Sequence, residues 1–180
     1  MAGFRAGNGA VWLDLLSTLA GRYEGERLDA IATPDHLRAW LRANDLEPRA
    51  AVTVADVAHT DEVRESLHRL AVATIRGDVA AASDVRRINA ALKHDGGLQV
   101  SWTSDGIRPR RPASVDDALA RLARQAAVDL AGHGHGALRA CGDDTCAGIF
   151  LDTTGRRRWC TDLRCGNRVR VRAHRGRVGS

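Results

Sequence analysis

Apolar positions at helical spacing predict a mainly helical chain up to about residue 132. Trp12, Leu15, Leu16 and Leu19 follow the i, i+3, i+4, i+7 rule, which gives one apolar face on a short helix. Comparable patterns, with Gly or Pro between them, recur four more times before residue 132. The further predicted helices begin at Pro34, cover 53–76, cover 78–93, and follow Ser114.

Capping residues set the expected helix ends. Thr33 before Pro34 and Ser114 before two aspartates are good N-caps, and Gly77 ends the helix 53–76. On that long helix we expect Arg64 to lie outside, among acidic neighbours. On the next helix we expect Val85 to point inward with the other apolar residues.

Alternating residues predict a single hairpin in this part of the chain. Residues 98–103 and 106–110 read as two strands with a turn around Asp105. The segment 22–31 reads as a loop, and the Gly-rich segment 1–9 as a frayed end. We therefore predict an α+β fold, in which a mainly helical N-terminal domain carries a small β-hairpin.

Four cysteines near the end carry the strongest chemical signal. They form two C-x4-C pairs separated by thirteen residues, and the chain has no others. Disulfides and metal ligation both use such clusters. Because no secretory leader is apparent, we expect a reducing, cytoplasmic setting and a zinc ion on four thiolates. The expected ligands are Cys141, Cys146, Cys160 and Cys165.

The residues around the cysteines suggest a small zinc module. Ile149–Leu151 is expected to pair with a returning strand at 156–160, so that a hairpin joins the two half-sites. A helix is expected from about Asp162 or Cys165 to Arg175. Alternation in 168–172 also permits a strand, but a helix is favoured. The order knuckle, hairpin, helix is treble-clef-like.

The sequence Cys165-Gly166-Asn167-Arg168, preceded by Arg158-Trp159-Cys160, closely resembles the CGNR zinc finger. This is a C-terminal module of bacterial proteins described as stress-induced transcription regulators. The resemblance covers roughly residues 138 to 178. It implies zinc on the four cysteines and DNA binding through the basic tail.

Charge is segregated toward the same end. Residues 133–180 contain ten Arg, no Lys and four Asp, a net of +6, whereas the whole chain is +5. Such a surface attracts phosphate backbones of any sequence. The alternative is an ordinary solvated face, since 26 of the 27 basic residues are Arg and the choice of Arg carries little information. The candidate DNA-binding residues are Arg156, Arg157, Arg158, Arg164, Arg168, Arg172 and Arg175, of which the last four form one stripe if the segment is helical.

Polar residues on the first helix are a second, weaker candidate site. Asp14, Ser17 and Thr18 share the side opposite its apolar face, where they either meet solvent or line a ligand pocket. Family members usually carry an L-D-x-x-N-T element, which residues 13–18 resemble, with Ser17 in place of Asn. The resemblance implies ligand contacts at these positions.

The expected domains are an N-terminal domain at 1–132, a Gly/His linker at 133–137 and the zinc finger at 138–180. The function expected is a DNA-binding transcription regulator whose N-terminal domain senses a small-molecule signal or forms a homodimer. The alternatives are a protein or RNA interaction module with structural zinc, and a zinc–thiolate redox sensor. No catalytic motif and no membrane-spanning run are apparent, so we expect neither an enzyme nor a membrane protein.

Overall fold

A computed structural model of the chain describes residue 4 and residues 6–23, 26–132 and 136–178. Residues 133–135, and with them most of the expected linker and its two histidines, lie outside the described residues. The elements are α1 (Val11–Leu16), β1 (Leu19–Ala20), β2 (Leu28–Asp29), α2 (Pro34–Ala43), α3 (Val54–Arg76), α4 (Ala82–Leu92), β3 (Val100–Thr103), β4 (Gly106–Pro109), α5 (Val115–Ala131), β5 (Leu138–Ala140), β6 (Ile149–Leu151), the π-helical turn η2 (Asp162–Gly166) and α6 (Asn167–Val178).

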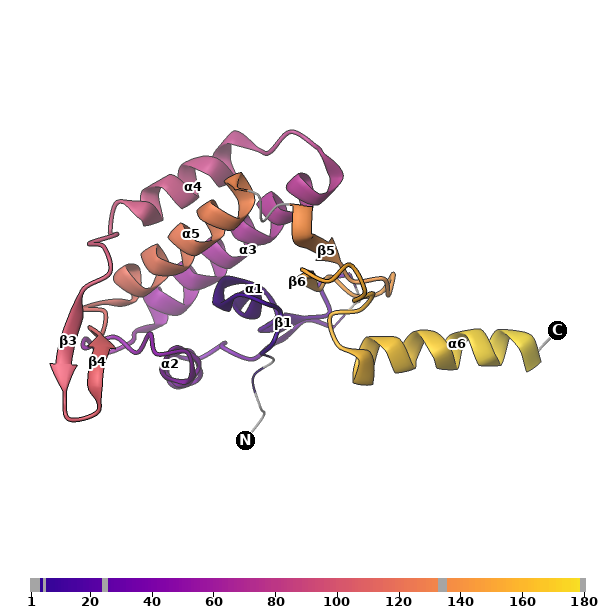
Figure 1. Cartoon of the computed structure of the whole chain (residues 1–180), viewed down its shortest axis with the longest axis horizontal. Coiled ribbons are helices and arrows are strands. Elements are labelled where there is room, and N and C mark those ends of the chain that lie inside the picture. Colours follow the sequence, from indigo (N-terminus) through magenta and orange to yellow (C-terminus); the bar gives the residue numbers. More distant parts are fainter. Residues whose placement is uncertain (1–3, 5, 24–25, 133–135, 179–180) are drawn as a thin grey trace.

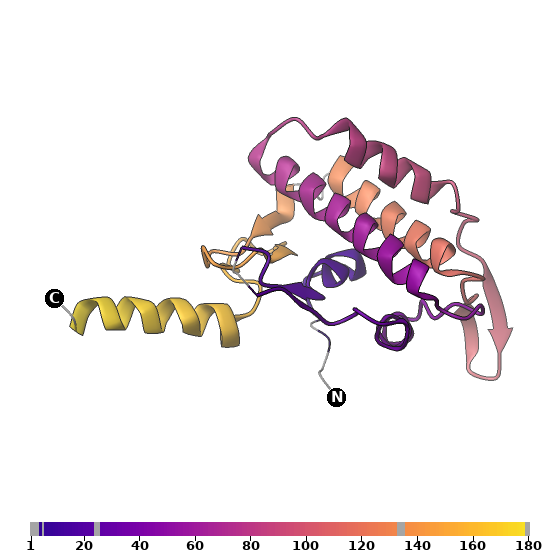
Figure 2. The same ribbon diagram turned by 180° about the vertical axis from the view of Figure 1, so that it is seen from behind.

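Helices α3, α4 and α5 pack side by side, and α1 contacts α3 and α5 from beneath (Figures 1 and 2). The core between them contains Trp12, Trp40, Leu67 and Leu119, all fully buried. Each such side chain contributes about 1.5–3 kcal/mol through burial. The N-terminal part is therefore organised around a helical core, and the α+β class is confirmed.

Helix ends follow the expected capping chemistry. Thr53 and Ser114 each form a capping box, with Asp56 and Asp117 respectively. Gly77 ends α3 in the left-handed region, with a φ of 72°.

The expected start of α4 was wrong. The helix begins at Ala82 instead of Asp78, because the Asp78 amide still bonds to Ala73 at the end of α3. Val85 is also exposed instead of inward, since Asp84 and Ile88 occupy the buried stripe of α4.

The expected hairpin forms as β3–β4, with Trp102 opposite Ile107. Its apolar side chains point to solvent, and Trp102 is 80% exposed. A second, very short ladder, β1–β2, pairs Leu19 with Asp29. β2 lies within 22–31, which was expected to be a loop. Leu19 was expected on the first helix, but that helix ends at Leu16 and Leu19 lies in β1. Gly21, directly after β1, has a φ of 72°, a left-handed conformation that favours glycine.

The expected partner of β6 was wrong. β6 pairs with β5, not with residues 156–160, so the hairpin encloses the first pair of cysteines instead of joining the two pairs. The Cys141 amide bonds to the Gly148 carbonyl at 2.8 Å, which draws 138–140 and 149–151 together. The segment 156–160 instead crosses the first knuckle, where the Gly142 amide bonds to the Arg158 carbonyl at 2.8 Å.

Residues 7–9, in the segment expected to be frayed, are fixed by contacts with the rest of the chain. Asn8 is buried, and its carbonyl accepts a 2.8 Å hydrogen bond from the Leu151 amide of β6. Its own amide donates to Asp14 of α1 at 3.0 Å. Because Leu138 and Ile149 also join the main core, the cysteine-containing part is packed against the helical part.

From this packed region α6 projects away from the body, at the end of the molecule opposite the β3–β4 hairpin (Figure 1). Within the described residues, no helix combines the length and the hydrophobicity that a membrane span requires.

Candidate metal centre and basic helix

The four cysteines come together as the sequence predicts. Their sulfur atoms all lie within 4.8 Å of one another, and none is in a disulfide. Cys160 Sγ lies 3.7 Å from Cys146 Sγ and 3.6 Å from Cys165 Sγ. A tetrahedral ion with metal–sulfur bonds of about 2.3 Å separates its ligands by about 3.8 Å. Both the donor set and the spacing therefore fit a metal ion held by four sulfurs.

Backbone amides support this cluster. The Gly148 amide donates to Cys146 Sγ at 3.3 Å, and the Cys160 amide donates to Cys141 Sγ at 3.4 Å. Amide donors of this kind orient sulfur ligands and favour the thiolate. They come from both halves of the site, so the two C-x4-C pairs are interlocked.

Crowding of the thiols shifts their acidity in opposite directions. Hydrogen bonds from Cys146 and Cys160 lower the pKa of Cys141. The hydrogen bond with Cys141 raises the pKa of Cys160 to about 12, and that of Cys146 is raised for the same reason. Four thiolates at this separation need a cation to offset their charge.

A buried carboxylate fixes the basic helix onto the first knuckle. Asp143 is 1% exposed, and it accepts a hydrogen bond from Arg168 Nε at 2.6 Å and another from Arg172. Burial raises the pKa of Asp143, but hydrogen bonds from Arg168 and Arg172 outweigh burial and lower it. Arg168 also approaches Cys165 Sγ at 3.8 Å. The first turns of α6 are thus tied to the metal site.

The sequence patterns did not indicate this role of Asp143. The available signal was a pair of aspartates inside a C-x4-C loop of an otherwise basic module.

The remaining candidate arginines lie in different surroundings. Arg157 packs over Phe150 at 4.4 Å and donates to the carbonyls of Gly7 and Trp159. Arg158 lies over Trp159 at 5.3 Å. In the described part of the chain four candidates are exposed and have no carboxylate partner. These are Arg156, Arg158, Arg164 and Arg175.

The polar residues of the first helix are engaged with the protein itself. Asn8 Nδ2 donates to Asp14 at 2.7 Å and to Ser17 at 2.9 Å. Thr18 points elsewhere and accepts from Arg64 at 2.7 Å. Asp14 and Thr18 are buried, so neither the solvent-facing alternative nor an open pocket describes them. Their contacts hold the N-terminal segment and α3 against α1.

Arg64, expected outside, is fully buried. It donates to both oxygens of Asp29, at 2.9 and 2.6 Å, and to Asp61 at 2.6 Å. These carboxylates neutralise its charge inside the domain, which sequence periodicity alone did not reveal.

Two family models match the chain. The model for ABATE, described as "putative stress-induced transcription regulator", matches residues 9–134. The model for the CGNR zinc finger matches residues 137–178. A comparison with individually curated proteins found no match. The first match covers more than half of the chain, and the second covers the four cysteines and α6. The chain therefore belongs to the ABATE family and carries a CGNR zinc finger at its C-terminal end.

Proposed function

We propose that this protein is a zinc-dependent, DNA-binding transcription regulator. The observation that carries the proposal is the basic helix α6, which leaves directly from the fourth sulfur of a four-cysteine cluster. In this proposal the finger contacts DNA, and the N-terminal domain senses a signal or joins two copies. The role of the ion is structural, since four protein ligands fill a tetrahedral shell and leave no position for water.

Zinc is the ion that best suits the donors. Four thiolates are a soft set, and Zn²⁺ accepts tetrahedral sulfur coordination without redox chemistry. With the ion bound, all four thiols are deprotonated.

The phosphate contacts are assigned to the arginines that the fold leaves available. Arg164 and Arg175 are exposed, and no carboxylate of the described residues pairs with them. Arg168 and Arg172 are about 40% exposed at the side chain but are bound to Asp143, so they also position the helix. Arg158 and Arg170 of α6 both lie over Trp159, at 5.3 and 5.7 Å, so Arg158 adjoins the basic helix, and Arg156 is exposed two residues before it.

A salt titration of the full, zinc-loaded chain with duplex DNA tests this assignment. Contacts at about five phosphates give a slope of log K against log salt near −4.5. Changing Arg164 and Arg175 together to Gln should reduce that slope by about two and weaken binding to all sequences alike. The matched control is Arg76→Gln, which removes an exposed charge at the end of α3.

Zinc content measured on the same samples separates the two roles of the basic residues. We expect it to be unchanged in the double variant. A salt-independent affinity, or equal loss in the Arg76→Gln control, would contradict the DNA proposal and favour a protein partner.

A single small module buries only about 600–1,000 Å² on DNA. Useful affinity therefore calls for a second copy, and we propose that the N-terminal domains supply it. The molar mass of the complex in the same titration should then correspond to two chains on each duplex.

A further inference from the structure

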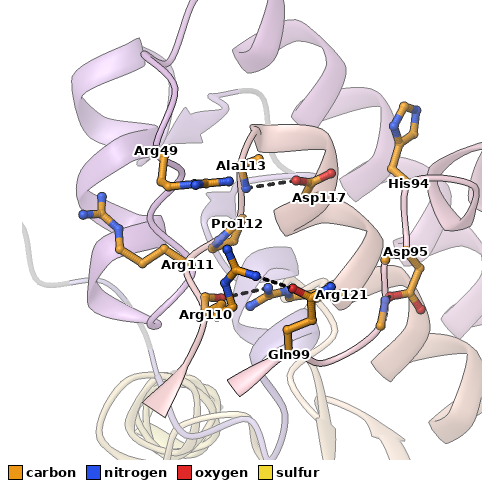
Figure 3. Close-up of a pocket in the computed structure, with 12 residues that line it drawn as sticks. Arg49, His94, Asp95, Gln99, Arg110, Arg111, Pro112, Ala113, Asp117 and Arg121 are labelled. Carbon is orange, nitrogen blue, oxygen red and sulfur yellow. Dashed lines mark hydrogen bonds between the residues drawn. The ribbon is translucent and has the colours of Figure 1, made fainter. Parts of the chain in front are cut away.

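A concave surface at the base of the β3–β4 hairpin is distinct from the metal centre. It has a volume of about 260 Å³ and lies between the end of α4, the residues that follow β4 and the start of α5 (Figure 3). The hairpin and α6 are at opposite ends of the molecule (Figure 1), so this pocket is not part of the finger's surface. None of the polar residues discussed for α1 lines it.

The pocket is strongly basic. Its charged lining consists of four arginines and two aspartates, besides His94, which leaves a net charge of +2. Charges just outside do not change this balance, because Glu47 pairs with one lining arginine and Arg124 with one lining aspartate. The lining arginines are Arg49, Arg110, Arg111 and Arg121.

Both lining carboxylates are already occupied. Asp117 accepts from the Ala113 amide at 2.9 Å and from the Ser114 amide, as part of the cap of α5. Asp95 accepts from the Gly97 amide at 3.1 Å and pairs with Arg124 at 3.3 Å. Neither is bonded to an arginine of the pocket lining. The aspartates therefore shape the wall. Arg111 gives its donors to the Glu47 and Pro48 carbonyls and pairs with Glu47, whereas the other three lining guanidinium groups keep most of theirs.

Arg49 is the clearest unused donor. Its backbone is held by a 2.9 Å hydrogen bond from its amide to the Pro112 carbonyl. Its guanidinium makes no hydrogen bond or ion pair with any described residue. Arg121 uses one N–H on the Arg110 carbonyl at 2.8 Å, and Arg110 uses one on Gln99 at 2.8 Å. Each guanidinium offers five N–H groups, so several stay available around the cavity.

We propose that this pocket binds a small anion that carries a phosphate group. A phosphate monoester bears close to two negative charges near neutral pH and presents three acceptor oxygens, which matches the net charge and the surplus of donors. Guanidinium groups bind such oxygens in bidentate fashion. The volume is just below the range typical of drug-sized ligand pockets, about 300–1,000 Å³, so it suits a compact metabolite.

The position of the pocket connects its occupant to the hairpin. Arg110 and Gln99 close the base of β3–β4 with two hydrogen bonds, one from the Arg110 amide and one from its side chain, each 2.8 Å long. An anion bound to Arg110 would therefore contact the residues that hold the two strands together. This inference goes beyond the DNA-binding proposal and does not depend on it.

Calorimetric titration of the full, zinc-loaded chain with glycerol 3-phosphate, in the absence of DNA, tests the proposal. We expect saturable binding of one molecule per chain at constant ionic strength. Inorganic phosphate should compete, whereas glycerol and acetate should not. Arg49→Gln and Arg121→Gln should each weaken binding at least tenfold, and the matched control Arg76→Gln should leave it unchanged.

Three results would overturn the proposal. These are the absence of saturable binding up to about 10 mM glycerol 3-phosphate, equal competition by acetate, and equal weakening in the Arg76→Gln control. Thermal melts of each variant verify folding. Arg49→Gln removes no hydrogen bond or ion pair with the described residues, so its effect reports on the pocket.

Discussion

At the residue scale, the metal centre depends on Gly148, which bears no sulfur. A β-carbon at this position would lie 2.8 Å from Cys160 Sγ and 3.2 Å from Cys146 Sγ. The same residue donates its amide to Cys146 Sγ. Any side chain here would push two sulfur ligands out of the positions that a tetrahedral shell needs. The residue two positions after Cys146 therefore has to be glycine.

Changing Gly148 to Ala should weaken zinc binding by about 10- to 100-fold, in the range seen when the surroundings of metal ligands are disturbed. Competition with a chromogenic chelator measures the affinity. The control is Gly176→Ala in α6, where a β-carbon meets no atom within 4 Å. Equal affinity for the parent and Gly148→Ala would show that the sulfurs move aside without cost.

Residue roles were predictable only where the sequence itself places partners together. The spacing of the cysteines predicted one cluster, and their sulfurs do meet. The burial of Arg64 was not predicted, because it depends on Asp29. That residue is 35 positions away, on a strand that the sequence did not indicate. Asp143 was missed for the same reason, since its arginine partners are 25 and 29 positions ahead.

At the scale of elements, Arg64 joins three segments inside the N-terminal domain. From α3 it reaches Thr18, after α1, and Asp29 in β2, and its side chain is 0% exposed. Burial raises the pKa of Asp29, but hydrogen bonds from Arg64 and from the Ile31 amide reverse this and lower it below its ordinary value of 3.8. A carboxylate with a lowered pKa stabilises the fold wherever it remains ionised.

Changing Asp29 to Asn should lower the free energy of unfolding by about 1.5–3 kcal/mol at neutral pH, the range for hydrogen bonds to charged groups. Because the folded-state pKa is depressed, this difference should be fully present above pH 3.8 and should shrink as the pH falls through the folded-state value. Urea unfolding of both proteins from pH 6 downward measures it. A difference that does not change with pH would exclude ionised Asp29 as its source.

Helix ends were predicted better than strand pairing, for a physical reason. Caps are local, so Thr33 and Ser114 could be identified from the residues that directly follow them. The partner of β6 is chosen by tertiary contacts, since Leu138 and Ile149 both enter the main core. Nothing in the alternation of residues 156–160 distinguished a paired strand from the crossing segment that the structure has.

At the scale of the whole molecule, the zinc finger packs against the N-terminal helical part and is not joined to it only through the chain that precedes the finger. The segment 7–9 bonds to α1 on one side and to β6 on the other. Gly9 has a φ of 98°, and its α-carbon lies so close to β6 that a β-carbon would be 2.7 Å from Leu151 Cβ. His68 of α3 adds a 3.1 Å contact with the Ala147 carbonyl beside the metal site.

Replacing Gly9 by Ala should separate the finger from α1, whereas Gly7→Ala is the matched control. Both glycines have a positive φ, 98° and 96°, so both substitutions carry similar backbone strain. Only at Gly9 would the added β-carbon meet an atom within 4 Å. The additional cost at Gly9 should be about 1–3 kcal/mol, typical of overpacking. Hydrogen exchange of the Leu151 amide should increase in Gly9→Ala alone, and similar exchange in both variants would contradict the contact.

Because Asp143 binds Arg168 and Arg172, the direction of α6 depends on the four-cysteine cluster. The carboxylate sits between two ligands in sequence, so it stays in place only while Cys141 and Cys146 hold the same ion. If oxidation or a stronger chelator removes that ion, we expect the loop 141–146 to open and α6 to lose its fixed direction. The helical core of the N-terminal domain should stay folded. We expect such treatment to release α6 from its fixed orientation without unfolding the rest of the protein.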